Sequence, residues 1–357
     1  MARFHTLRIK EIRREAPGCV SVAFDVPEEV AEEYRFKAGQ YLTLRTELDG
    51  EDIRRSYSIC SSPGENELRV AIKQVPGGKF STYANERLKE GTTLEVMTPM
   101  GNFHTPIHPG HCKNYVAFAV GSGITPVISL MKAILEGEPQ GAFTLFYGNR
   151  TTDSILFREA LEGLKNRYLD RLGLFHILSR QDQGSALLSG RIDETKCATI
   201  FSRLIDPAEI DEFFLCGPET MIHSIRQQLE SLGVDRKRIH FELFTTGLSP
   251  ERRQKPLWQG EGPAIQSSVT IRLDGNTFQF GMPSHGETLL EAALKAGADL
   301  PFACKGGVCC TCKAKLLEGE ADMEVNYALE PDELEAGYIL TCQAHPKTAT
   351  LMIDFDS

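Results

Sequence analysis

The chain has 357 residues, of which 41% are hydrophobic and 25% charged, and a formal net charge of −10. This length favours two or three domains, and the composition is that of an ordinary globular protein. The acidic balance argues against nucleic acid as a partner. No apolar run approaches the roughly 20 residues needed to span a bilayer. The N-terminus has no apolar signal core, so we expect a cytoplasmic protein without a membrane partner.

The first domain, residues 1–108, is predicted to be a small antiparallel β-barrel. Short segments of alternating polarity are separated by turn residues, a pattern typical of such barrels. The glycine-rich stretch at 76–81 is predicted to be a turn after the third strand. The predicted strands are 40–48, 56–61 and 68–75.

The second domain, residues 109–244, has a different pattern of predicted secondary structure. Fully apolar strands alternate with segments of helical spacing, which predicts a doubly wound parallel sheet. The predicted strands are 114–120, 143–149, 174–180 and 212–218, and the predicted helices are 127–137, 154–168 and 219–233.

Residues 245–266 are rich in proline, glycine and polar residues and are predicted to be a linker. A third domain, residues 267–357, follows. It opens with two strands around Asp274 and Gly275, a dipeptide that favours a tight hairpin turn.

Four of the ten cysteines lie in the stretch CKGGVCCTC at 304–312. The spacing of Cys304, Cys309 and Cys312, with Cys342 thirty positions on, is that of plant-type ferredoxins, which bind a [2Fe–2S] cluster. Four thiolates must converge on two irons, and the glycines inside the stretch allow the backbone to loop tightly around them. The sequence therefore predicts an iron–sulfur centre.

Zinc is the alternative metal for this cluster of cysteines. A structural zinc site would need a second CxxC pair or a histidine pair, whereas only Cys342 and His345 are available. Cys310 does not fit the ferredoxin spacing, and we interpret it as a packing residue.

The stretch GSGITP at 121–126 lies between a predicted strand and a predicted helix. Gly121 and Gly123 would let the backbone approach a pyrophosphate, and Thr125 followed by Pro126 is a favourable start for a helix whose N-terminus attracts anions. Cys216, in the stretch CGP, ends a later strand at the same carboxyl edge of the sheet. Ligands bind at that edge in folds of this kind.

Arg150, Ser179 and Arg180 lie at the ends of the two intermediate strands, and no acidic residue stands directly at either strand end. An acidic residue there would bind the ribose diol and favour NAD, whereas arginine accommodates a 2′-phosphate. We therefore expect NADPH. The alternative is that Arg150 and Arg180 are ordinary surface residues.

The stretch RRSYSIC at 54–60 resembles the R-x-Y-S flavin signature of the ferredoxin–NADP reductase superfamily. GGKFS at 77–81 resembles the flavin-phosphate turn of that superfamily, GSGITP resembles its nicotinamide loop, and CGP its strand end beside the nicotinamide. These four stretches occur along the chain in the same order as in the superfamily, and a plant-type ferredoxin domain follows them. The resemblance implies a multidomain fold: an antiparallel β-barrel flavin domain, an α/β doubly wound nicotinamide-binding domain and a β-grasp ferredoxin domain.

The resemblance also implies roles for residues around a bound FAD. Tyr57 would lie on the isoalloxazine, Arg55 on the pyrophosphate and Ser58 near the flavin N5. Gly78 and Ser81 would hold the phosphates. The assignment of FAD rather than FMN rests on the resemblance alone.

On the nicotinamide side, the resemblance implies that Thr125 and Cys216 position the coenzyme. Glu242 and Phe244, in the stretch HFELF, are a weaker match and would close over the flavin. Ser58 and Cys216 are the candidate catalytic residues.

Three longer stretches narrow the resemblance: YGNRT, DLPFACKGGVC and NYALEPDELEAGYILTCQA. They are similar to reductase subunits of phenylacetyl-CoA epoxidases. This implies an NADPH-dependent reductase that passes electrons through FAD and a [2Fe–2S] cluster to the oxygenase component of a multicomponent monooxygenase. The alternatives are a reductase for a steroid or aromatic-ring hydroxylase and, from a different class, a redox-responsive regulatory binding protein.

The negative charge is concentrated in the third domain. Residues 267–357 hold 14 acidic and six basic residues, and the segment 318–335 holds eight acidic residues and no lysine or arginine. Such a segment is either a solvated face or a docking surface for a basic partner, because a patch of one sign steers encounters.

Overall fold

The computed structural model describes residues 3–244 and 263–357. These form two compact units, which we describe separately. The larger contains Phe4–Ile53 and Tyr57–Phe244, and the smaller contains the described residues from 263 onward together with Arg3 and Arg54–Ser56. The predicted linker lies outside the described residues except for its last four. No helix in the described ranges is long and apolar enough to cross a membrane.

The larger unit begins with a six-stranded antiparallel sheet in the order β4-β3-β6-β1-β2-β5. Just beyond β4, Ile59 bridges to Val70 of β5, and the Cys60 N–H donates to the Arg69 carbonyl at 2.8 Å. These contacts join the two end strands, so the predicted barrel is confirmed. The strands are β1 (Phe4–Ala16), β2 (Cys19–Asp25), β3 (Tyr41–Leu48), β4 (Glu51–Ser58), β5 (Leu68–Lys73) and β6 (Thr93–Met97).

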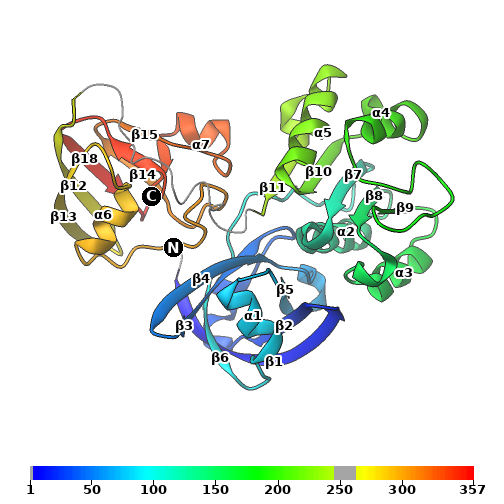
Figure 1. The fold of residues 1–357 in the computed structure, drawn as a ribbon, viewed down its shortest axis with the longest axis horizontal. Coiled ribbons are helices and arrows are strands. Elements are labelled where there is room, and N and C mark those ends of the chain that lie inside the picture. Colours follow the sequence, from blue (N-terminus) through cyan, green and yellow to red (C-terminus); the bar gives the residue numbers. More distant parts are fainter. Residues whose placement is uncertain (1–2, 245–262) are drawn as a thin grey trace. The chain divides into compact units, whose positions relative to one another are not determined.

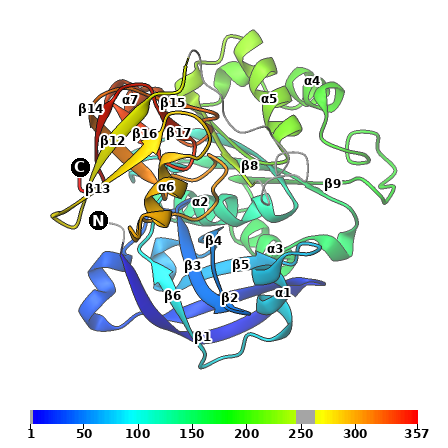
Figure 2. The same cartoon turned by 60° about the vertical axis from the view of Figure 1, so that its left-hand side comes forward.

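Two predictions in this region are wrong. Strand β4 begins at Glu51 and ends at Ser58, earlier than the predicted 56–61. The predicted turn at 76–81 contains the start of helix α1 (Lys79–Glu86), which lies beside the barrel in Figures 1 and 2. The helix forms because Phe80 and Ala84, one turn apart, are both buried in the barrel core.

The rest of the larger unit is a five-stranded parallel sheet in the order β11-β10-β7-β8-β9. Helices α2 and α3 lie on one face, and α4 and α5 on the other (Figures 1 and 2). The predicted doubly wound sheet is confirmed. The elements are β7 (Asn114–Val120), α2 (Ile124–Gly137), β8 (Ala142–Asn149), α3 (Arg158–Arg167), β9 (Leu172–Leu178), α4 (Glu194–Arg203), β10 (Glu212–Gly217), α5 (Glu219–Ser231) and β11 (Ile239–Leu243).

Alternate side chains of the parallel strands supply two separate cores. On β7, Tyr115 and Ala117 join the core that contains α2, while the ring of Phe118 lies 5.8 Å from that of Phe201 on α4. Both faces are covered, which is why these strands are apolar at nearly every position.

The smaller unit is a mixed sheet in the order β13-β12-β18-β14-β16, in which β12 and β18 run parallel. Leu289, Leu290 and Ala293 of helix α6 pack with the sheet in one core, as expected of a β-grasp fold. The hairpin at Asp274 and Gly275 is confirmed. The elements are β12 (Gln266–Leu273), β13 (Asn276–Pro283), α6 (Leu289–Lys295), β14 (Lys313–Glu318), β15 (Ala321–Met323), α7 (Pro331–Glu335), β16 (Tyr338–Leu340), β17 (Ala344–Pro346) and β18 (Thr350–Asp354).

Candidate functional site

Strand β4 carries the predicted flavin residues with alternating exposure. Arg55 is exposed, Tyr57 is half-buried and Ser58 is buried. The Tyr57 ring lies 5.6 Å from that of Phe80, with an interplanar angle of 36°. Packing against a buried phenylalanine fixes one side of the tyrosine ring, so its orientation is set by the barrel core.

The predicted flavin-phosphate turn is held by its own side chains. The Val75 N–H donates to Ser81 Oγ at 3.1 Å, and Ser81 Oγ donates to the Gly78 carbonyl at 3.2 Å. A Cβ at Gly78 would lie 2.5 Å from Ser81 Oγ, so any larger residue there would displace the Ser81 hydroxyl from these hydrogen bonds. Ser81 therefore shapes the turn, and the N–H groups at the start of α1 are the backbone donors that an anion here would meet.

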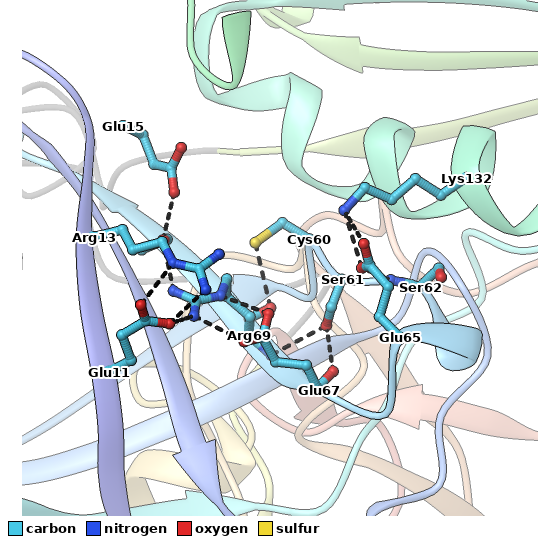
Figure 3. A network of polar contacts seen from close by, with 11 residues as sticks. Glu11, Arg13, Glu15, Cys60, Ser61, Ser62, Glu65, Glu67, Arg69 and Lys132 are labelled. Carbon is cyan, nitrogen blue, oxygen red and sulfur yellow. Dashed lines mark hydrogen bonds and ion pairs between the residues drawn. The ribbon is translucent and has the colours of Figure 1, made fainter. Parts of the chain in front are cut away.

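A buried arginine organises the loop that follows β4 (Figure 3). Arg69 on β5 is 4% exposed and donates to Ser21 Oγ at 2.9 Å and to Glu67 at 2.7 Å. Its backbone N–H donates to Ser61 Oγ at 3.1 Å. The charge is paired and hydrogen-bonded, as a buried guanidinium requires.

Helix α2 reaches the same loop. Ser129 Oγ donates to the Ser61 carbonyl at 2.6 Å, and Lys132 pairs with Glu65 at 2.8 Å (Figure 3). The loop after the flavin strand is thus attached to the helix that follows the predicted nicotinamide loop. Although far apart in sequence, the two parts of the site share one set of hydrogen bonds.

The predicted nicotinamide loop is a single 3₁₀ turn, Gly121–Gly123, between β7 and α2. Gly121 has a φ of +57°, and its carbonyl accepts a hydrogen bond from Tyr147 Oη at 2.9 Å. A Cβ at Gly123 would lie 2.1 Å from the Cys216 carbonyl oxygen. The loop therefore packs directly onto the end of β10, and only glycine permits the approach.

The predicted helix start at Thr125 is wrong. Helix α2 begins at Ile124 with Gly123 as its N-cap, because the preceding turn is already helical. Thr125 lies inside the first turn, is buried, and donates from Oγ1 to the Ser122 carbonyl at 3.0 Å.

The structure brings the two candidate catalytic residues to one place through Glu242. Strand pairing sets Cys216 on β10 beside Glu242 on β11, and Ser58 Oγ donates to Glu242 Oε2 at 2.8 Å. Burial raises the pKa of Glu242 to about 7, against the smaller opposing effect of the Ser58 hydrogen bond. Burial, and then the nearby Glu242, raise the pKa of the Cys216 thiol well above its ordinary value. Cys216 is thus a neutral thiol, and Glu242 can hold a proton near neutral pH.

We expect Glu242→Gln to remove a pH dependence of stability. The pKa of this carboxyl rises from 4.5 to about 7 on folding. The shift adds its full contribution to the free energy of unfolding below pH 4.5, and this contribution is lost as the pH rises through 7. The stability of the parent relative to the variant should therefore fall by about 3 kcal/mol over that interval. Thermal unfolding midpoints at pH 5 and pH 8 measure the change. The exposed Glu159→Gln variant is the control, and parallel pH profiles for parent and Glu242→Gln would contradict the assignment.

The ends of β8 and β9 bring the predicted 2′-phosphate residues together. The Arg180 N–H donates to the Arg150 carbonyl at 2.8 Å, and the Ser179 N–H donates to the Asn149 carbonyl at 2.9 Å. Arg150, Ser179 and Arg180 are all exposed at this edge. The two guanidinium groups therefore stand on neighbouring strand ends, where a phosphate could contact both.

Asn149 is a residue that the sequence analysis missed. It is 7% exposed, and its Nδ2 has no hydrogen-bond partner in the part of the chain that the structure describes. A buried amide donor without a partner at the carboxyl end of a strand fits a ligand that supplies the acceptor. Its place directly before Arg150 was the only signal in the sequence.

Phe244, the other predicted cofactor residue on this side, follows β11. It is half-buried and packs against the core that contains Cys216 and helix α2.

The predicted cluster ligands are gathered in the smaller unit. Cys309 Sγ lies 3.0 Å from Cys304 Sγ, and Cys342 makes side-chain hydrogen bonds with both Cys304 and Cys312. Thiols of Cys309 and Cys342 and the N–H groups of the loop donate to Cys304, which holds the pKa of that thiol well below its ordinary value. The same contacts raise the pKa values of the Cys309 and Cys342 thiols, so Cys304 is the sulfur of this group that most readily becomes a thiolate, the form that ligates metal.

The cysteine loop is supported from behind. Lys305 and Gly307 have φ of +50° and +72°, and the Gly307 carbonyl accepts a hydrogen bond from the Tyr327 N–H at 3.0 Å. Cys310 donates to the Ala328 carbonyl at 3.2 Å and lies in the core with α6. Its side chain thus serves packing in this arrangement.

Across residues 3–244 and 263–357, no three His, Cys, Asp or Glu side chains are placed to hold a single metal ion. The four thiols instead contact one another in pairs: Cys304 with Cys309, and Cys342 with Cys304 and with Cys312. A [2Fe–2S] cluster takes four cysteines over two irons, and a set of four cysteine donors gathered around one loop fits that group.

Comparison with known proteins finds the same three kinds of domain in this chain. Three family models match: an oxidoreductase FAD-binding domain at residues 7–105, an oxidoreductase NAD-binding domain at 118–227 and a 2Fe-2S iron-sulfur cluster binding domain at 271–347. The solved structure of phthalate dioxygenase reductase superimposes with a TM-score of 0.60 at 24% sequence identity. The match covers 99% of this chain and 98% of the phthalate dioxygenase reductase chain.

Two curated relatives are similar over nearly their full length. One subunit of the 1,2-phenylacetyl-CoA epoxidase of Escherichia coli is 45% identical over 100% of this chain and 99% of that protein. The ferredoxin reductase component of 3-ketosteroid-9-alpha-monooxygenase from Rhodococcus rhodochrous is 34% identical over 98% and 96%.

The fold, the site and the family models together define an NAD(P)H-dependent oxidoreductase of the ferredoxin–NADP reductase superfamily, with FAD and a C-terminal [2Fe–2S] domain. Such a protein transfers electrons and needs no acid–base triad. Within this class, the chain belongs to the same family as that 1,2-phenylacetyl-CoA epoxidase subunit.

Proposed function

We propose that this chain delivers electrons from NADPH to the oxygenase component of a multicomponent monooxygenase, and that phenylacetyl-CoA epoxidation is the reaction served. The observation that carries the proposal is the meeting of Ser58, Glu242 and Cys216 at the carboxyl edge of the parallel sheet. When bound, FAD supplies the conversion between two-electron and one-electron chemistry, and the cluster supplies a one-electron carrier. The 45% identity to the epoxidase subunit supports the choice of reaction.

The residues of the chain bind and orient rather than react covalently. On the flavin side, the set predicted from sequence is proposed to act together: Arg55, Tyr57, Ser58, Gly78 and Ser81. On the nicotinamide side, the proposed set is Gly121, Gly123, Thr125, Arg150, Ser179, Arg180, Cys216 and Phe244, to which the structure adds Asn149. Buried Ser58 and Cys216 exclude water from the reacting edge, and Ser58 holds the Glu242 carboxyl in place. The proposed metal ligands are Cys304, Cys309, Cys312 and Cys342.

Arg180 is proposed to recognise the 2′-phosphate of NADPH. We expect Arg180→Ala to raise the KM for NADPH about tenfold, because a charge-assisted hydrogen bond is worth about 1.5 kcal/mol or more. The KM for NADH should change by less than about twofold, since NADH lacks that phosphate. Steady-state kinetics with both coenzymes measure the effect.

Arg203→Ala, on the exposed side of α4, is the matched control for Arg180→Ala. Equal losses with NADPH and NADH would assign Arg180 to another role.

The acidic segment 318–335 is proposed as the partner-docking surface. Leu334 on α7 and Leu317 on β14 are 41% and 45% exposed, and both lie within two residues of acidic side chains. Exposed apolar side chains beside charge of one sign are typical of protein interfaces. None of the ten cysteines, all within the described ranges, forms a disulfide, which is consistent with a proposed cytoplasmic location.

The test is reconstitution with purified oxygenase components. The holoprotein is combined with NADPH and the oxygenase of phenylacetyl-CoA epoxidase, and product formation is compared with the same mixture containing the oxygenase of 3-ketosteroid 9α-hydroxylase. We expect turnover with the first. Turnover with the steroid enzyme alone would support the second candidate, which the 34% identity favours. Turnover with neither would contradict the proposed partner class.

A further inference from the structure

A second polar pocket opens at the opposite end of the parallel sheet from the nicotinamide loop. It is an open depression of about 610 Å³ at the amino ends of β7, β10 and β11, beside residues 104–106. This volume is in the range of small-molecule sites. Gly121 follows the carboxyl end of β7 and Cys216 lies near the carboxyl end of β10, and the pocket shares no residue with the coenzyme site described above.

Five of the ten residues that line the pocket have basic side chains. Two of its residues are acidic, Asp211 and Glu212, and two are histidines. Three of the lining side chains carry a permanent positive charge, namely Lys113, Lys237 and Arg238. The basic residues are His104, Lys113, Lys237, Arg238 and His240.

Glu212 neutralises only one of the cations. Its Oε1 lies 2.6 Å from Lys113 Nζ and accepts from Thr105 at 2.9 Å, and its Oε2 lies 3.1 Å from His240 Nε2. Burial would raise the pKa of Glu212, but the hydrogen bonds from His240, Lys113 and Thr105 outweigh it and lower the pKa to about 2. Glu212 is therefore ionised and fully engaged, and it fixes the Lys113 ammonium at the wall of the pocket.

Arg238 is oriented by backbone carbonyls. Its Nε donates to the Asp211 carbonyl at 3.0 Å, and its Nη2 donates to the Pro207 carbonyl at 3.4 Å. Neutral carbonyls hold the guanidinium plane without cancelling its charge. A fixed guanidinium with remaining donors is suited to an oxyanion.

Lys237 supplies a further uncompensated charge. It is exposed, and in the ranges that the structure describes its ammonium has no hydrogen-bond or ion-pair partner. Burial lowers the pKa of His104, and the positive charges of Lys37 and His240 lower it further. The electrostatic environment of His104 is therefore positive.

We propose that this pocket is a second ligand site, which binds a small molecule carrying a phosphate or carboxylate oxyanion. An incoming oxyanion would meet the side chains of Lys237 and Arg238 directly. The site is separate from NADPH binding and does not depend on which oxygenase the protein serves.

The test is calorimetric titration of the full-length holoprotein with pyrophosphate and, separately, with citrate. Saturating NADP⁺ is present throughout, so that the coenzyme site is filled. We expect saturable one-to-one binding of at least one probe, weakened about tenfold or more in Lys237→Ala, since the loss of one charged contact costs at least about 1.4 kcal/mol. Binding of pyrophosphate alone assigns the site to phosphate ligands, and binding of citrate alone assigns it to carboxylates.

Lys10→Ala is the matched control, because Lys10 is an exposed lysine on β1 that does not line the pocket. Its affinity should equal that of the parent. The proposal is overturned by the absence of saturable binding up to about 10 mM, a weak-affinity limit. It is also overturned by unchanged affinity in Lys237→Ala, or by an equal loss in Lys10→Ala.

Discussion

Cys342→Ser is expected to abolish the visible absorption of the [2Fe–2S] cluster and to lower electron delivery to the oxygenase by about a hundredfold or more. Cys342 is 4% exposed and makes hydrogen bonds with Cys304 and Cys312, so no other side chain can take its place without moving the loop. Iron content and the spectrum beyond 500 nm measure cluster loss. NADPH oxidation with ferricyanide, a small acceptor that can react with the flavin directly, should stay within about twofold, because the larger unit is untouched.

Cys310→Ser is the matched control for Cys342→Ser. Cys310 is buried in the same loop, but it donates to the Ala328 carbonyl, a bond that serine can also make. We expect this variant to keep its iron and its spectrum. Loss of iron in Cys310→Ser together with retention in Cys342→Ser would mean that Cys310 is a ligand and Cys342 is not. The ferredoxin spacing would then not describe the site.

The features predicted best from the sequence are those set by short-range rules. The spacing of Cys304, Cys309 and Cys312 fits one type of loop, and the structure gathers these residues with Cys342. The strands of the parallel sheet are apolar at nearly every position because both faces are covered, so β7 and β10 stand out with almost correct bounds.

The errors arise where tertiary packing decides. Helix α1 lies partly on a glycine-rich stretch that predicts a turn, and it forms because Phe80 and Ala84 fill the barrel core. Strand β4 begins at Glu51, in a polar segment whose pairing depends on the neighbouring β3 rather than on its own composition.

The contacts that complete the site are long-range and were only partly predictable. Ser58 and Glu242 are 184 positions apart and lie in different sheets, yet the fold brings their side chains into one hydrogen bond. The match of Glu242 to the family was weak, and nothing in the sequence indicated its raised pKa. Likewise, Lys113 precedes β7, Glu212 begins β10 and His240 lies on β11, so these residues form a cluster only after the sheet is assembled.

Gly123→Ala is expected to lower the rate of NADPH oxidation by about a hundredfold, because a displacement of roughly 1 Å at a reacting edge costs about that much. The added Cβ would lie 2.1 Å from the Cys216 carbonyl oxygen, where ordinary contact begins near 3.4 Å. The atom in conflict is backbone, so either the loop or the end of β10 must move. Both carry residues proposed to position the nicotinamide, and stopped-flow reduction of the flavin by NADPH measures the loss directly.

Gly163→Ala separates this effect from the general consequences of replacing a glycine. Gly163 lies inside α3, and a Cβ there would meet nothing within 4 Å. We expect a gain in stability of about 0.5–1 kcal/mol and an unchanged rate. The flavin spectrum of Gly123→Ala, recorded before the kinetics, shows whether the barrel still holds its cofactor. A fully flavinated Gly123→Ala that is reduced at the parent rate would mean that the contact between the glycine loop and Cys216 does not set the position of the coenzyme.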